Sequence, residues 1–230
     1  MKTLLRWGIA VLALLPLLGY AAPKLPDITK DNAGKKIAVV SVSANNFGNS
    51  LQGWNKVSTS DLMATQLNEM LHFLEQRFAD KWAVIEAETY VGKPEFQDLA
   101  GEQREVGLPK FGEFTMPLMS KNRNQLVKTQ LDQDVAQSLA KATGADFLIV
   151  AYSEWGVQTG KWVPTTKPLA KNVLSVYSAE GKQVFFGRVD KVGTKTLGAL
   201  GNVYVDEDTI GEWVSAFNEG IEAIYAGRKK

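Results

Sequence analysis

The chain has 230 residues, with 26 Lys and Arg against 25 Asp and Glu, one His and no Cys. This balance of charge gives the protein no overall attraction to nucleic acid or to an anionic membrane surface. The missing cysteines exclude disulfides and thiolate metal ligands, and one histidine cannot build a typical zinc site without them. Burial of apolar side chains must therefore stabilise the fold without covalent cross-links, and the chain is long enough for one domain with a full-sized core.

Residues 1–21 have the pattern of a secretory signal peptide. Lys2 and Arg6 precede an apolar stretch, and small residues follow at the positions that a signal peptidase reads. The apolar stretch is shorter than the roughly 20 residues of a membrane-spanning helix. We therefore expect export, cleavage near Ala21 or Ala22, and a periplasmic location of the Gram-negative type. Because no cysteine follows the cleavage site, we expect neither a lipoprotein nor stable membrane insertion after cleavage.

The rest of the chain is expected to form a linker over 22–34 and one α/β domain over 35–230. Regular periodicity is lost within this domain over 92–122, where three prolines and four glycines occur. A structureless loop longer than about 15 residues is uncommon in a compact domain. We therefore interpret 92–122 as an irregular insert, which could be a lid, a short hairpin, a partner-binding arm or a packed connection.

The first half of the domain predicts a strand, a helix and a second strand. The run 35–43 is apolar at consecutive positions, which is typical of a strand buried on both faces. Apolar residues recur at three- and four-residue steps over 58–81, which predicts an amphipathic helix with Ser58 in its capping box. The alternation of apolar and polar residues over 82–91 predicts a half-exposed strand.

The second half of the domain predicts two helices around three strands. Gly144 suits the left-handed position after a helix, and Gly181 suits the turn of a hairpin. Thr209 and Glu212 have the spacing of a capping box for the last helix. The expected elements are, in order, a helix (124–144), a strand (145–153), two hairpin strands (172–178 and 182–192) and a helix from 208 to the C-terminal region.

The element order is therefore β-α-β-(insert)-α-β-β-β-α. It predicts an α/β fold with α+β character, in which three main helices pack on a single mixed sheet of about five strands. The βαβ units require parallel pairing, and the hairpin near the end requires antiparallel pairing.

Catalytic and metal-binding signatures are missing from the sequence. His72 lies beside the apolar stripe of the first helix and is interpreted as a boundary residue, and no Gly-x-Ser-x-Gly elbow supplies a nucleophile. Glycosidases need only two carboxylates, so Glu86, Glu88 and Glu154 remain candidates for a periplasmic enzyme acting on cell-wall glycan or another envelope substrate. We expect no cofactor and no metal, and we favour a protein that is not an enzyme.

Aromatic residues follow two of the predicted strands, 35–43 and 145–153. In open α/β sheets, ligands and partners tend to meet the loops beyond the carboxyl ends of the strands. Tryptophan offers a large contact area with a polar N–H group, which suits interface anchors and sugar-stacking platforms. The alternative for each ring is that it fills the end of the core. We predict a partner-binding rim formed by Phe47, Trp54, Trp155 and Trp162.

Three sequence elements resemble a known group of periplasmic α/β domains. These elements are "IAVVSVS" near the start, "GADFLIVAYSEWG" from Gly144 to Gly156, and the hairpin "LSVYSAEGKQVFFGRV". In type and order they are similar to elements of the curli secretion protein CsgG, of the penicillin-binding-protein activator LpoB and of the N-terminal domain of TolB. The chain lacks the lipid-carrying cysteine typical of CsgG and LpoB, and nothing in it is similar to long amphipathic membrane hairpins.

The resemblance implies a non-enzymatic envelope protein that docks on another macromolecule, with an envelope protein or a peptidoglycan component as partner. Two alternatives stay open. One is the carboxylate-pair enzyme, and the other is a small-ligand carrier in which the insert at 92–122 acts as a lid.

Overall fold

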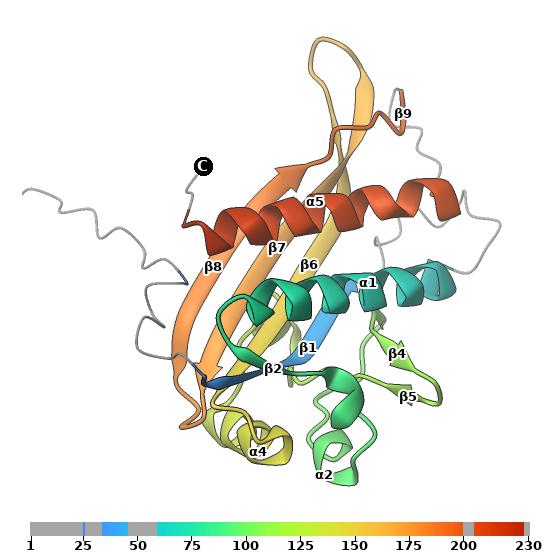
Figure 1. Ribbon diagram of the computed structural model, residues 1–230. Coiled ribbons are helices and arrows are strands. Elements are labelled where there is room, and N and C mark those ends of the chain that lie inside the picture. Colours follow the sequence, from blue (N-terminus) through green and yellow to red (C-terminus); the bar gives the residue numbers. More distant parts are fainter. Residues whose placement is uncertain (1–24, 26–33, 46–58, 200–204, 228–230) are drawn as a thin grey trace, which may run out of the picture.

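The computed structural model describes residue 25 and residues 34–45, 59–199 and 205–227. Its centre is a mixed sheet in which five strands lie in the order β2-β1-β6-β7-β8 (Figure 1). Strand β1 is parallel to β2 and β6, whereas β7 is antiparallel to both β6 and β8. The predicted mixed α/β sheet is thus confirmed. The five strands are β1 (Lys36–Asn45), β2 (Ala83–Ile85), β6 (Phe147–Thr159), β7 (Thr165–Ser178) and β8 (Gln183–Val192).

Four short strands complete the β-structure of the described residues. Strand β3 (Val106–Gly107) pairs with the end of β1, and β9 (Gly198–Ala199) pairs with the start of β7. Strands β4 (Lys110–Phe111) and β5 (Phe114–Thr115) form a separate hairpin. Three of these four strands lie in the insert at 92–122, which therefore contains a short hairpin.

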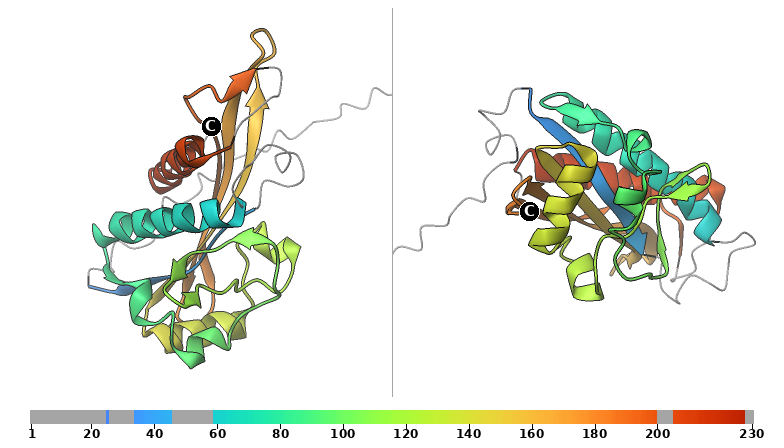
Figure 2. Two further views of the ribbon diagram at one scale, coloured as in Figure 1. Left: turned by 90° about the vertical axis from the view of Figure 1, so that its right-hand side faces the viewer. Right: turned by 90° about the horizontal axis from the view of Figure 1, so that it is seen from below.

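The long helices α1 and α5 cover one face of the sheet, side by side (Figures 1 and 2). Their inward faces meet a continuous apolar core that includes six residues of β1. Eight consecutive residues of this strand are buried, so it is buried on both faces as predicted. Within the described residues, no helix has both the length and the apolar character needed to span a bilayer. The helices are α1 (Thr59–Ala79), α2 (Pro94–Gln97), α3 (Arg123–Leu126), α4 (Gln133–Thr143) and α5 (Glu207–Tyr225), with a 3-10 turn, η3, at Ala87–Thr89.

The chain between α3 and α4 packs on the opposite face of the sheet. Thr129 is buried and forms a short hydrogen bond with Ser175, and the Tyr177 hydroxyl donates to Thr129 O at 3.1 Å. The Leu131 N–H donates to the same hydroxyl at 2.9 Å. Ser175 and Tyr177 project from this face because they alternate along β7 with Asn172, which faces α5.

Two predicted elements are shorter than the sequence indicates, for local reasons. The strand expected over 82–91 ends at Ile85, because the chain then turns inward and buries Tyr90, whose hydroxyl donates to Val39 O at 2.7 Å. The helix expected over 124–144 is interrupted between α3 and α4. There Thr129 has a φ of 48°, and Thr129 O and the Leu131 N–H bond to the Tyr177 hydroxyl of β7 instead of continuing a helix.

Three predicted end signals can be compared with the structure. Gly144 follows α4 with a φ of 73°, and Gly181 closes the β7–β8 turn with a φ of 77°, as expected for positions that favour glycine. The cap of α5 differs from the prediction. Asp206 and Thr209 form the reciprocal capping box, whereas Thr209 and Glu212 do not. Ser58 lies outside the described residues.

A buried polar contact fixes α5 against the sheet. Asn172 on β7 accepts a hydrogen bond from Ser153 Oγ at 2.7 Å and donates from Nδ2 to Ala216 O at 3.2 Å. A Cβ atom on Gly220, one helical turn beyond Ala216, would collide with Nδ2 of Asn172. The absence of a side chain at Gly220 therefore lets α5 approach β7 closely enough to satisfy the buried amide.

We expect Gly220→Ala to lower the free energy of unfolding, and Gly211→Ala in the same helix to raise it. The nearest atom to a Cβ on Gly211 is Gln66 Oε1 at 3.8 Å, so that substitution gains helix propensity of about 0.5 to 1 kcal/mol. Overpacking at Gly220 costs about 1 to 3 kcal/mol, which exceeds the gain in helix propensity from the same change to alanine. Urea denaturation of the two variants measures the difference. Equal stability of the two variants would contradict the close contact between α5 and β7.

Candidate functional site

Strands β6 and β7 continue past the helical layer as an arm, with the short strand β9 paired to the start of β7 (Figures 1 and 2). Their antiparallel register is unbroken from Phe147 opposite Ser178 to Thr159 opposite Thr166. Residues 160–164 close the arm, and the Gly160 N–H donates to Thr165 O at 3.0 Å. The loop that the sequence indicated after residue 153 is thus the outer half of a hairpin, so the strand is longer than predicted.

The tip of the arm carries two apolar side chains in solvent. Trp162 is 96% exposed and Val163 is 63% exposed. Tryptophan is highly buried on average in folded proteins, so an indole left almost fully in water is informative. Lys161 and Lys167 flank the pair in the sequence. The tip therefore presents an aromatic ring at the end of a regular hydrogen-bonded support.

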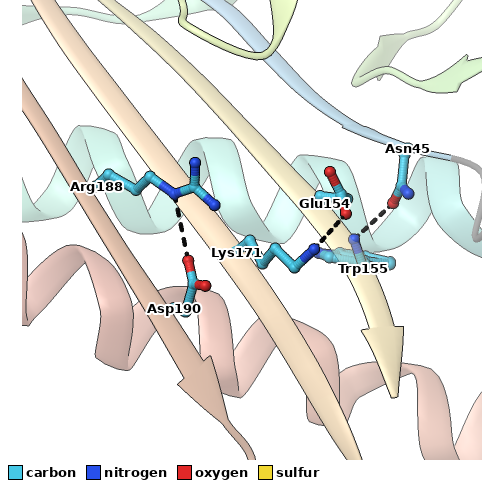
Figure 3. A network of polar contacts seen from close by, with 6 residues as sticks. All are labelled: Asn45, Glu154, Trp155, Lys171, Arg188 and Asp190. Atoms are coloured by element: carbon cyan, nitrogen blue, oxygen red, sulfur yellow. Dashed lines mark hydrogen bonds and ion pairs between the residues drawn. The ribbon is translucent and has the colours of Figure 1, made fainter. Parts of the chain in front are cut away.

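Trp155 belongs to the core, and its predicted place on an exposed rim is corrected. The residue is 1% exposed, and its ring stacks on Trp213 of α5 with centroids 6.4 Å apart. Its backbone N–H donates to Asn45 Oδ1 at 2.6 Å (Figure 3). The sequence placed Trp155 beyond the end of a strand, whereas β6 continues and α5 covers this face of it.

The other two predicted rim residues, Phe47 and Trp54, lie outside the described residues. They follow β1, which is the parallel neighbour of β6, so the carboxyl ends of the two strands meet at one edge as expected. Trp155 and Trp162 are not brought together, because one lies under α5 and the other lies at the tip of the arm. Of the four predicted rim residues, Trp162 is the one that the structure shows in solvent.

A pocket of about 800 Å³ lies between α1 and the insert. Leu71, Glu75 and His72 of α1 line one side, and Phe111 and Phe114 of the β4–β5 hairpin line the other. The hairpin is held on α1 by Asn68, which donates to Lys110 O and accepts from Lys110 N, both at 2.8 Å. The pocket is open and its lining is mixed, so it differs from the closed apolar cavity that would favour a ligand carrier.

Glu75 is a half-buried carboxylate in this pocket that the sequence analysis did not identify. It accepts a hydrogen bond from the Ala87 N–H at 2.7 Å. Burial raises the pKa of Glu75, and the nearby Glu86 adds to the rise, whereas the hydrogen bond from Ala87 acts against it. The helical periodicity places Glu75 outside the apolar stripe of α1, but the sequence did not predict the turn at Ala87–Thr89 that covers it.

The three carboxylates proposed for catalysis do not converge. Glu86 and Glu88 line the large pocket, whereas Glu154 lines a smaller pocket of about 390 Å³ on the face of the sheet opposite α5, beside α3. We call this face, where the chain between α3 and α4 does not cover it, the open face. The Lys171 ammonium pairs with Glu154 at 2.7 Å (Figure 3). Of the three, Glu86 and Glu88 share a pocket, in which Glu75 lies as well. In the described part of the chain, no group of three His, Asp or Glu residues is arranged to hold a metal ion.

The open face of the sheet combines Tyr152, Glu154, Lys171, Arg188 and Asp190. Burial and the neighbouring Glu154 raise the pKa of Tyr152 to about 12, so the phenol stays protonated at neutral pH. Arg188 Nε lies 3.5 Å from Asp190 Oδ1 (Figure 3). Opposite charges therefore neutralise one another across this surface, which does not form a field of one sign.

Comparisons with known proteins do not assign this chain to a family. No family model matches the chain, and no curated protein matches it. Among solved structures, it is similar to the hypothetical protein CT253 from Chlamydia trachomatis, at 11% identity over 84% of this chain and 92% of that chain, with a TM-score of 0.40. It is also similar to lipoprotein GNA1162 from Neisseria meningitidis, at 12% identity over 79% of this chain and 94% of that chain, with a TM-score of 0.38. These values are too low to establish a shared fold.

We expect Glu75→Gln to stabilise the protein more at pH 7 than at pH 4, relative to the wild type. A carboxyl whose pKa is raised by folding favours the folded state below its ordinary pKa and loses that contribution as pH rises through the raised pKa. The glutamine keeps an acceptor for Ala87 but cannot ionise. Chemical denaturation at both pH values measures the change, and Glu69→Gln, an exposed position on the same helix, is the control. An equal effect of Glu75→Gln at the two pH values would contradict the raised pKa.

Proposed function

We propose that this protein is an exported, non-enzymatic docking factor of the bacterial envelope, and that it binds an envelope protein through the tip of the β6–β7 arm. The observation that carries the proposal is the 96% exposure of Trp162 at the end of a regular hairpin. Export rests on the signal-peptide pattern of residues 1–21. A peptidoglycan component is the alternative occupant of the tip.

The arm has the properties of a preformed interface anchor. Tryptophan is among the residues that most often dominate binding energy, because one side chain fills a pocket and excludes water there. The ladder from Phe147 to Thr159 holds the ring on an ordered support, so less conformational entropy is lost on binding than with a disordered loop. Val163 extends the apolar contact area beside the indole.

The 800 Å³ pocket favours a second function, the binding of a small ligand. Its volume is within the usual range for such sites, and the insert forms one of its walls. Asn68 fixes that wall to α1 through two hydrogen bonds, so the β4–β5 hairpin is anchored at Lys110. Docking remains our preferred function because the exposed indole has no structural role within the described residues.

We expect Trp162→Ala to abolish docking without changing stability, and Trp155→Ala to unfold or strongly destabilise the protein. Truncating an exposed ring removes few internal contacts, whereas truncating a buried tryptophan typically costs about 3 to 5 kcal/mol. Thermal unfolding followed by circular dichroism measures the stability of the two variants. The buried position of Trp155 thus reverses the stability effect expected from an exposed rim.

Docking itself is tested with a photo-crosslinking amino acid at Val163 in cells that export the full chain. We expect a discrete adduct that falls at least about tenfold when Trp162→Ala is added, as for a hot-spot residue. The same crosslinker at Lys182, which is exposed in the β7–β8 turn at the other end of β7 from the tip, is the control position. An adduct of the same yield with and without Trp162 would contradict the proposal. An adduct to glycan strands would show that the partner is peptidoglycan and not a protein.

A further inference from the structure

Strand β8 is a long edge of the main sheet. Its neighbour is β7, and within the described residues no other strand pairs with its outer side. The register with β7 is regular from Phe185 to Val192, after an irregularity next to Gln183. An edge strand of this length presents a row of backbone donors and acceptors that can pair with another strand.

The outward-facing backbone groups of β8 can be assigned from its ladder. Leu169 lies opposite Val192, and the next residue, Gly193, donates its N–H to Pro168 O at 2.8 Å. Antiparallel ladders alternate between bonded and non-bonded pairs, so every second residue before Gly193 also bonds to β7. The N–H and C=O groups that point away from β7, in the plane of the sheet, therefore belong to Phe186, Arg188, Asp190 and Val192.

The side chains of these four residues share the open face of the sheet. The intervening Lys191 faces the other way and pairs with Glu219 of α5 at 3.7 Å. Phe186 is 48% exposed, so an apolar ring lies in solvent beside the edge. Arg188 and Asp190 carry opposite charges two residues apart on this face. The outward row therefore reads apolar, positive, negative, apolar.

We propose that β8 pairs antiparallel with β8 of a second copy of this chain, about a two-fold axis at Val189. In this register Arg188 of each copy lies opposite Asp190 of the other, and Phe186 lies opposite Val192. The row of side chains is thus complementary to itself, which a symmetric dimer interface requires. Opposite charges and apolar pairs placed directly across an antiparallel ladder are stabilising, whereas like charges are destabilising.

Neighbouring registers lack this match. An axis at Arg188 or at Asp190 would place two like charges directly opposite each other. An axis at Gly187 would place Arg188 opposite Phe186, and an axis at Lys191 would place Asp190 opposite Val192. Registers displaced by one residue are excluded because the two-fold axis keeps the open face of both copies on the same side. An axis at Val189 is therefore the arrangement that places opposite charges and apolar side chains directly across from each other.

The test is a charge exchange across the interface, measured by sedimentation velocity on the product purified after expression of the full chain. The wild type is expected to show a concentration-dependent monomer–dimer equilibrium. Arg188→Asp alone and Asp190→Arg alone each create two like-charge pairs per dimer, so each should weaken dimerisation at least about tenfold. The double variant Arg188→Asp with Asp190→Arg restores both pairs and should restore the wild-type equilibrium.

Lys182→Asp is the matched control. It reverses a charge at an exposed position in the same hairpin, outside the paired segment, and should leave dimerisation unchanged. Circular dichroism of all four variants verifies that each is folded. A wild type that remains monomeric up to its highest soluble concentration would overturn the proposal, as would a double variant as weak as the single ones. A failure of the Trp162 experiment would leave this result unaffected, because the arm and the β8 edge are tested separately.

Discussion

The contact between α5 and the middle of the sheet is the constraint on which the other features depend. Asn172 ties β7 to Ala216 O and to Ser153, and Trp213 Nε1 donates to Gly156 O at 2.7 Å. Gly156 lies opposite Leu169, which pairs with Val192 at the end of β8, so the arm begins beyond this position. The same helix therefore buries Trp155, holds the base of the arm, and packs on one face of β8, whose outer side pairs with no other strand among the described residues.

Much of the fold could be predicted because the core elements have strong periodicity. The consecutive apolar residues of β1 and the apolar stripe of α1 reflect burial that is continuous along each element. Gly144 and Gly181 marked ends of elements because only glycine adopts their backbone conformation at low cost. Thr129 left no such mark, since its positive φ is stabilised by contacts with β7 that come from distant sequence.

The candidate site was harder to predict because it departs from those periodicities. The outer part of β6 contains Gly156 and runs into a segment with Gly160 and Pro164, so it resembles a loop when it is considered alone. It is a strand because thirteen residues of β6 each face a partner on β7. Trp155 was misplaced for the same reason, since its stacking partner Trp213 lies in the last helix. Trp162 lies in solvent, as a rim residue must, and its position between Gly160 and Pro164 was the sequence signal for the end of a hairpin.

The construction of the arm has a consequence for how relatives of this protein could vary. Because the arm is an extension of two central strands, its length can change by whole residue pairs without disturbing the core. Each insertion of two residues in both strands would displace the tip by about 7 Å and return Trp162 to the same side. An insertion of one residue per strand would turn the ring to the opposite side. Reach and orientation are thus separately adjustable, and variation in steps of two would keep the orientation of the indole while changing its distance from the sheet.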